Sequence, residues 1–114
     1  MPFTAQPQGE VVVVTIRTKR LDAHLAPEFK AKLVHLVQSG HERIVMDMAV
    51  LESIDSSGLG ALIAGLKALG GHGEMVLCGI TPRLLSLLQL THVDKLFQMF
   101  DSVEEAVGEL VTSA

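Results

Sequence analysis

Short apolar runs rich in β-branched residues alternate along this chain with longer segments whose apolar residues recur at helical spacing. The run at residues 11–17 (VVVVTIR) predicts a strand buried on both faces or nearly so. Further strands are predicted at 43–48, at 74–78 and, as a short one, at 96–100. Because helical segments separate these strands, the pattern predicts an α/β fold: a small, mainly parallel (mixed) β-sheet of about four to five strands with about four helices packed on it.

The predicted helices carry recognisable start and stop signals. They span residues 27–39, 57–69, 82–90 and 103–111. Gly40 ends the first helix, and the glycine-rich stretch 70–73 ends the second. Thr81 supplies an N-cap just ahead of a first-turn proline in the third, and Ser102 opens a capping-box pattern ahead of the fourth. Residues 18–25 fit neither pattern and leave room for another short strand.

The composition is typical of a folded globular protein. Apolar residues make up 48% and charged residues 19% of the 114 residues, so we expect a single domain over 1–114 with its core at about 10–112. The formal net charge of −4 disfavours a nucleic-acid partner, which requires a basic face. Cys78 is the single cysteine and cannot form an internal disulfide. The chain shows neither a signal-peptide pattern nor an apolar run of membrane-spanning length, so we expect a cytoplasmic protein without membrane insertion.

The most unusual stretch is residues 54–60 (IDSSGLG), which places a carboxylate and two hydroxyls at the start of an apolar helix. Asp, Ser and Gly are common at helix N-termini, so a simple helix cap is one interpretation. The other is a phosphorylation site at Ser56. A helix N-terminus tolerates a phosphate because it has unpaired N–H groups and the positive end of the helix dipole. A phosphoserine there adds roughly −1.5 to −2 charges to an exposed position.

Other motifs for phosphate binding or catalysis are incomplete. Gly58 and Gly60 suggest a dinucleotide-binding loop, but Ile63 replaces the third glycine of GxGxxG, and both glycines lie inside the predicted helix. Close helix packing is the better interpretation of both. The chain contains neither a P-loop nor a nucleophile elbow, and its five histidines lack paired ligand spacing. We therefore expect no enzymatic activity, no cofactor and no metal.

Residues 55–60 ahead of an apolar helix resemble the signature of bacterial anti-sigma factor antagonists (anti-anti-sigma factors) and related STAS domains. The likeness continues through 73–78 and Thr81 to the final helix, and it reaches back to Asp22. It covers nearly the whole chain in the right order. The resemblance implies a small sheet with helices stacked on one side.

The resemblance also implies a regulator of transcription that works by partner switching. Ser56, directly after the aspartate, would be the phosphorylation site. The partner-binding residues would be Asp22, Asp55, Ser56, Ser57 and Gly58. The unphosphorylated form would sequester an anti-sigma factor that is itself a serine kinase with a histidine-kinase-like ATPase fold, and phosphorylation would release that partner. A metal-dependent serine phosphatase would reset the switch.

Other roles stay open at this point. Lys19 and Arg20 stand where the family often has Gly-Glu, which changes the charge at the expected docking edge. STAS domains also serve as accessory subunits of lipid- or anion-transport complexes, where Ser56 would be a contact residue or a cap. An enzyme with Ser56 as nucleophile is the least favoured reading, because the sequence names no base for it.

Overall fold

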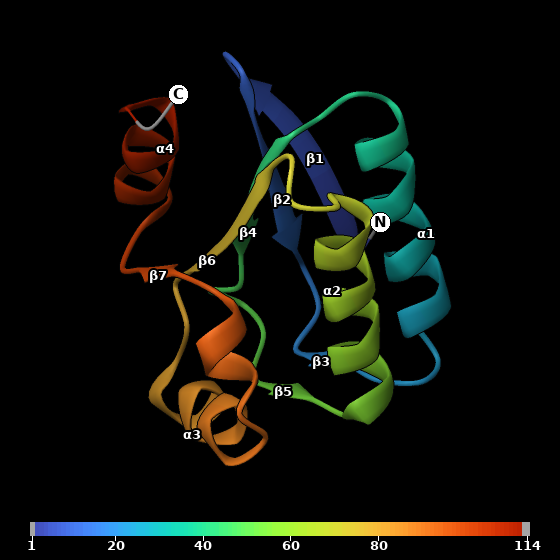
Figure 1. Cartoon of the computed structure of the whole chain (residues 1–114). Helices are drawn as coiled ribbons and strands as arrows, with labels where there is room; N and C mark the ends of the chain where they lie inside the picture. The colour runs from blue at the N-terminus through green and yellow to red at the C-terminus, as the bar shows by residue number, and fades with distance from the viewer. Residues whose placement is uncertain (1, 113–114) are drawn as a thin grey trace.

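A mixed five-stranded sheet forms the centre of the computed structural model, which describes residues 2–112 (Figure 1). In spatial order its strands are β1 (Phe3–Gln8), β2 (Val11–Ile16), β4 (Arg43–Asp47), β6 (Glu74–Cys78) and β7 (Met99–Phe100). β1 runs antiparallel to β2, whereas the remaining neighbours are parallel. The predicted α/β architecture with a mainly parallel, mixed sheet is thus confirmed.

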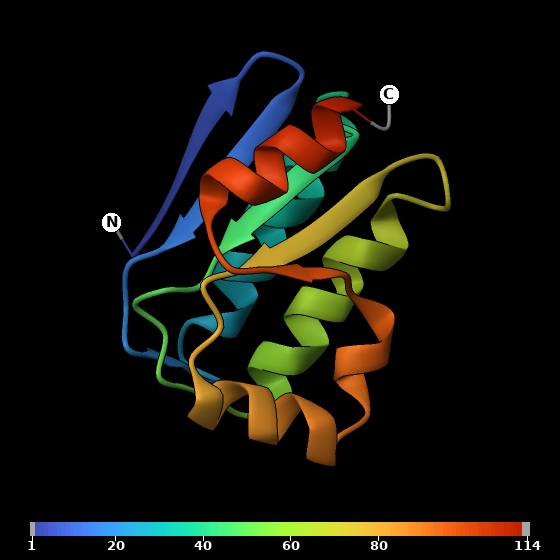
Figure 2. The same ribbon diagram turned by 90° about the vertical axis from the view of Figure 1, so that its left-hand side faces the viewer.

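Helices cover both faces of this sheet. The first face carries α1 (Ala26–Gln38) and α2 (Ser56–Ala68), and the opposite face carries α4 (Val103–Thr112) (Figures 1 and 2). α3 (Pro82–Leu90) lies at the carboxyl ends of the strands, and its Leu84 and Leu88 join the core beneath α1 and α2. The family resemblance had implied that the helices stack on one side of the sheet. That expectation is wrong, because α4 covers the other face. β2 shows why, because its side chains alternate between two cores. Val12 and Val14 face the α1–α2 side, whereas Val11 and Val13 pack beneath α4.

The chain before residue 10 contributes to the core, contrary to the expected core boundary. Phe3 of β1 is 2% exposed, and its ring lies 5.0 Å from that of Phe29. The sequence did not indicate β1, because Pro7 and exposed glutamines interrupt its pattern. An edge strand accepts a proline, since its outer N–H groups need no ladder partner. Gly9, with a φ of 65°, makes the tight connection to β2.

A second, two-stranded parallel sheet lies at the carboxyl ends of β2 and β4. It pairs β3 (Arg20–Leu21) with β5 (Ser53–Ile54). β3 fills the room left for a short strand at 18–25, while β5 was not predicted. The predicted strand at 96–100 is shorter than expected, because Val93–Leu96 forms a 3-10 turn and only Met99–Phe100 pairs with β6.

The predicted helix starts are confirmed with small shifts. Thr81 Oγ1 accepts a hydrogen bond from Leu84 N (3.2 Å), and Ser102 Oγ accepts one from Glu105 N (3.2 Å).

Within residues 2–112 no helix combines the length and the apolar character needed to cross a bilayer.

Candidate functional site

Asp55 fixes the start of α2 and joins two loops. Its Oδ1 accepts a hydrogen bond from Gly58 N (2.9 Å), which makes Asp55 the N-cap of the helix. Its Oδ2 accepts a second bond from Ala23 N (3.1 Å), in the loop that leads into α1. A single carboxylate therefore holds the N-terminal ends of α1 and α2 side by side.

Ser56 is the first residue of α2, and its side chain is exposed. Asp55 already provides the cap, so Ser56 has no capping role. Within residues 2–112 the Ser56 hydroxyl makes no hydrogen bond, and the same holds for the exposed Ser57. The interpretation of this stretch as a simple cap therefore applies to Asp55 and leaves the Ser56 hydroxyl available for chemistry.

Asp22 shapes the neighbouring loop. Its Oδ1 accepts a hydrogen bond from His24 N (3.0 Å), and its carbonyl oxygen accepts one from Ala26 N (2.8 Å) at the start of α1. The side chain is half-buried. Because Asp55 is bonded to Ala23, the structure brings Asp22 to the same end of the molecule as the two serines.

The two glycines of α2 play different parts. A Cβ on Gly58 would lie 2.5 Å from the carbonyl oxygen of Leu21 and 2.6 Å from a side-chain carbon of Ile54, so this buried glycine allows α2 to approach the small sheet closely. A Cβ on Gly60 would meet nothing within 4 Å. Close packing is therefore confirmed for Gly58 and wrong for Gly60. Since Gly58 is buried, it supports the surface from beneath.

A groove runs beside the exposed serines. It has a volume of about 490 Å³ and lies between the first turns of α1 and α2. It is lined by Ala23, Ala26, Pro27, Lys30, Ser57, Gly60 and Ala61. The lining is small and mostly apolar, with the Lys30 ammonium as its cation. Sequence reasoning missed Lys30 and Pro27, because only the packing of α1 against α2 brings them next to Ser57.

The STAS domain family model matches residues 3–106, from the first residue of β1 into α4. The chain belongs to the STAS domain family.

Proteins similar to this STAS domain include several named anti-sigma factor antagonists. The anti-sigma F factor antagonist of Paenibacillus polymyxa is 28% identical over 101 residues, which cover 87% of this chain and 86% of that protein. The anti-sigma factor antagonist SpoIIAA, solved in its unphosphorylated form, superimposes with a TM-score of 0.74 at 23% identity, covering 98% of this chain and 99% of that one. SpoIIAA of Bacillus has also been solved in its phosphorylated form, with a TM-score of 0.72 at 23% identity, covering 94% and 97% of the two chains.

A sulfate transporter family protein from Wolinella succinogenes shares the fold as well. It superimposes with a TM-score of 0.79 at 18% identity, covering 92% of this chain and 88% of that one. At these identities the solved structures establish a common fold and no common role.

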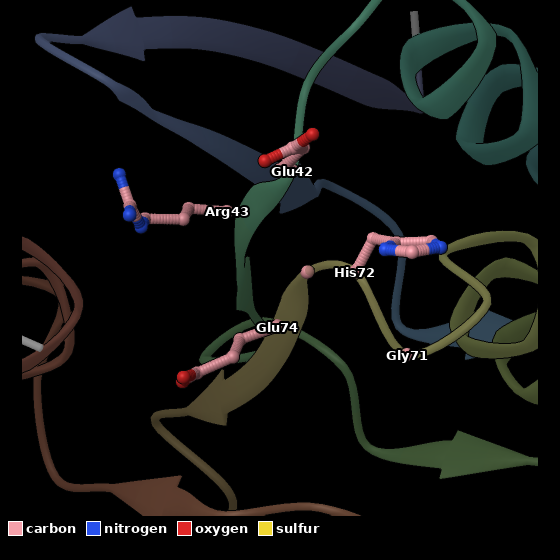
Figure 3. Close-up of a pocket in the computed structure, with 6 residues that line it drawn as sticks. Glu42, Arg43, Gly71, His72 and Glu74 are labelled. Carbon is pink, nitrogen blue, oxygen red and sulfur yellow. The ribbon is translucent and has the colours of Figure 1, made fainter. Parts of the chain in front are cut away.

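A polar pocket of about 170 Å³ lies at the opposite end of this STAS domain, where β4 and β6 begin. Figure 3 shows that the side chains of Glu42, His72 and Glu74 point in different directions. The Arg43 guanidinium donates a hydrogen bond to Glu10 at 2.8 Å. No group of three or more His, Cys, Asp or Glu side chains in the described part of the chain is placed to hold a metal ion.

Proposed function

We propose that this STAS domain is an anti-sigma factor antagonist, and that phosphorylation of Ser56 controls its binding to the anti-sigma factor. The observation that carries the proposal is the exposed Ser56 hydroxyl, which makes no hydrogen bond within residues 2–112 although it stands at a capped helix N-terminus. In its unphosphorylated form the protein sequesters an anti-sigma factor that is also a serine kinase with a histidine-kinase-like ATPase fold. Its capture frees a sigma factor, and transcription follows.

For phosphoryl transfer, this chain has to present the Ser56 hydroxyl to the active site of the kinase. Ser56 Oγ attacks the γ-phosphorus of ATP on the kinase, the bond from phosphorus to the ADP oxygen breaks, and a base of the kinase takes the hydroxyl proton. The N-terminus of α2 tolerates the new charge, because N–H groups and the helix dipole favour an anion there. The domain therefore stays folded in both states.

The phosphate ends the complex by changing the surface. It adds roughly −1.5 to −2 charges at a position adjacent to the Asp55 carboxylate. A partner surface complementary to a neutral hydroxyl meets a large desolvation cost and repulsion from any carboxylate nearby. Asp22, Asp55 and Ser57 belong to the same contact face, and Gly58 supports it from beneath. A metal-dependent serine phosphatase removes the phosphate and resets the switch.

The names of the relatives support this proposal. The Paenibacillus polymyxa protein is an anti-sigma F factor antagonist, and SpoIIAA exists in unphosphorylated and phosphorylated forms. The second candidate function is an accessory subunit of a lipid- or anion-transport complex, which the fold of the Wolinella succinogenes protein favours. In that role no kinase would act on Ser56.

The test combines phosphorylation with capture of the partner. Wild type, Ser56→Ala, Ser56→Asp and the matched control Ser57→Ala are incubated with lysate of the source organism and ATP, and phosphopeptides are identified by mass spectrometry. We expect a phosphate on Ser56 in wild type and in Ser57→Ala, and none at this site in Ser56→Ala. A Ser56→Ala protein that still accepts phosphate from the kinase contradicts the assignment.

The captured proteins distinguish the two functions. In a capture without added ATP, where wild type stays unphosphorylated, we expect wild type and Ser56→Ala to retain a histidine-kinase-like ATPase, and Ser56→Asp to bind it at least about tenfold more weakly. If wild type and Ser56→Asp retain transporter components equally, the result contradicts the phosphorylation switch and supports the accessory-subunit function.

A further inference from the structure

Three cations gather at the carboxyl-end edge of the molecule, next to the small sheet. Lys19, Arg20 and Arg83 line a groove of about 400 Å³ together with Thr18, Glu52 and Ser53. Lys19 and Arg20 come from the β2–β3 connection and β3, whereas Arg83 comes from the first turn of α3. Segments far apart in the sequence thus build one basic surface on a chain whose net charge is −4.

These cations are available to a partner. All three residues are exposed, and within residues 2–112 the ion pair that the structure contains is Arg43 with Glu10, at the other end of the sheet. Glu52 is the single carboxylate that lines the groove. Because three unpaired cations face one carboxylate, the groove attracts acidic groups.

The basic groove continues into an apolar one. A second depression of about 280 Å³ shares Glu52, Ser53 and Arg83 with the first and extends along α3 over Ile54, Leu87 and Leu90. The Leu90 side chain is 80% exposed, the most among the large apolar side chains that lie at the surface. Leu90 is not isolated, because it lines this depression together with Ile54 and half-buried Leu87, and a contiguous apolar surface is what binding sites present.

From these contacts we infer that the joined groove, called here the β5–α3 groove, binds an acidic segment of the partner protein that also carries an apolar side chain. Glutamate or aspartate side chains pair with Lys19, Arg20 and Arg83, and a leucine-like side chain covers Leu90. The groove reaches Ile54, two residues before Ser56, so one partner can cover both. This inference rests on the proposed function for the identity of that partner, the anti-sigma factor kinase.

The apolar half of the groove favours a protein segment over a nucleic acid. A phosphate backbone would meet the three cations, but it offers nothing apolar to cover Leu87 and Leu90. A peptide with both acidic and apolar side chains satisfies both halves of the groove.

The direct test is an NMR titration of the isotope-labelled full chain with a short synthetic peptide of alternating Glu and Leu. The control peptide carries Lys in place of each Glu. We expect saturable shifts of the backbone signals of Arg20, Arg83 and Leu90 with the acidic peptide alone, and weaker binding at higher salt. Shifts confined to another face, equal shifts with the basic peptide, or no shifts would overturn the inference.

Variants make the test specific. Arg83→Glu keeps the fold, because an acidic residue is favourable in the first turn of a helix, and Leu90→Ser changes an exposed position. We expect each to raise the dissociation constant of the acidic peptide roughly five- to tenfold. Lys67→Glu, a charge reversal in the last turn of α2, is the matched control and should leave it unchanged.

The same variants separate this inference from the proposed function. If the kinase is captured and phosphorylates Ser56 while Arg83→Glu and Leu90→Ser bind it as tightly as wild type, the β5–α3 groove is not its docking site and the proposed function stands. If the acidic peptide occupies the groove but no kinase acts on Ser56, the groove is confirmed as an acidic-segment site and the kinase assignment fails.

Discussion

At the residue scale, Asp55 and Ser56 have different roles. The sequence left open whether this stretch is a helix cap or a phosphorylation site, and the structure assigns the cap to Asp55. The Asp55 carboxylate bonds Gly58 N and Ala23 N, so it serves the structure. Ser56 follows directly and keeps its hydroxyl free within residues 2–112. The modification in the proposed function therefore removes no hydrogen bond that the described chain makes, which keeps its cost to the fold low.

Gly58 and Gly60 provide a matched pair at this site. Gly58→Ala places a methyl group 2.5 Å from the Leu21 carbonyl oxygen, so we expect a loss of about 2 kcal/mol or more in the free energy of unfolding. Gly60→Ala enters open space and improves helix propensity, so we expect a gain of up to about 1 kcal/mol. Urea unfolding measures both, and equal effects would contradict the packing described for Gly58.

The Cys78 thiol should be unreactive in the folded protein. Burial raises its pKa to about 12, and the nearby carboxylates of Asp47 and Glu104 act in the same direction. Because the thiolate is the reactive species, we expect no labelling by a disulfide reagent near neutral pH and full labelling in denaturant. Rapid labelling of the native protein would show that Cys78 is accessible.

At the scale of elements, short structures at the carboxyl ends of the strands build the end of the molecule that carries Ser56. β3 and β5 contain two residues each, and backbone hydrogen bonds from Ser53 N to Lys19 O (3.1 Å) and from Asp55 N to Leu21 O (3.2 Å) hold them together. This small sheet sets the position of Ser56 at the start of α2 and of the cations beside α3. It connects the β5–α3 groove to the surface around Ser56 and Ser57, called here the serine face.

The caps of α2 and α3 predict different costs when removed. Asp55→Ala loses both the cap bond to Gly58 and the bond to Ala23, so we expect a destabilisation of about 2 kcal/mol. Thr81→Ala loses the cap bond to Leu84 alone, for which about 1 kcal/mol is expected. Denaturant unfolding compares the two. A loss at Asp55 no larger than at Thr81 would show that the bond between the loops adds no stability.

At the scale of the whole molecule, the five-stranded sheet separates two hydrophobic cores. The larger core lies beneath α1, α2 and α3, and the smaller one lies between the sheet and α4. Figure 2 shows α4 lying across this second face of the sheet. The serine face and the β5–α3 groove belong to the end formed by the first set of helices, so α4 contributes to stability without entering the proposed contact surface.

Two neighbouring residues of α4 test whether this helix stabilises the fold without taking part in partner binding. Leu110 is fully buried against the sheet, so Leu110→Ala should lower the free energy of unfolding by about 2–5 kcal/mol. Val111 is 54% exposed, and Val111→Ala should change it by less than about 0.5 kcal/mol. Both variants should bind the proposed partner like wild type once folded. A selective loss of partner binding in Leu110→Ala under native conditions would place α4 in the interface.

The sequence by itself determined the elements whose signals are local. β2, β4 and β6 follow from continuous apolar runs, and the four helices follow from apolar periodicity and from the caps predicted at Thr81 and Ser102. The order of these elements implies the parallel sheet. The stretch around Ser56 was recognisable for the same reason, because its residues are contiguous.

Tertiary structure alone decided the rest, because those features depend on distant partners. Two-residue strands such as β5 have no periodicity, and β1 is a strand only because β2 offers it an edge. Gly58 and Gly60 look alike in sequence, and only the backbone of Leu21 distinguishes them. Arg83 joins Lys19 because α3 packs beside β5, an arrangement set by burial of apolar side chains rather than by any signal near the charges themselves.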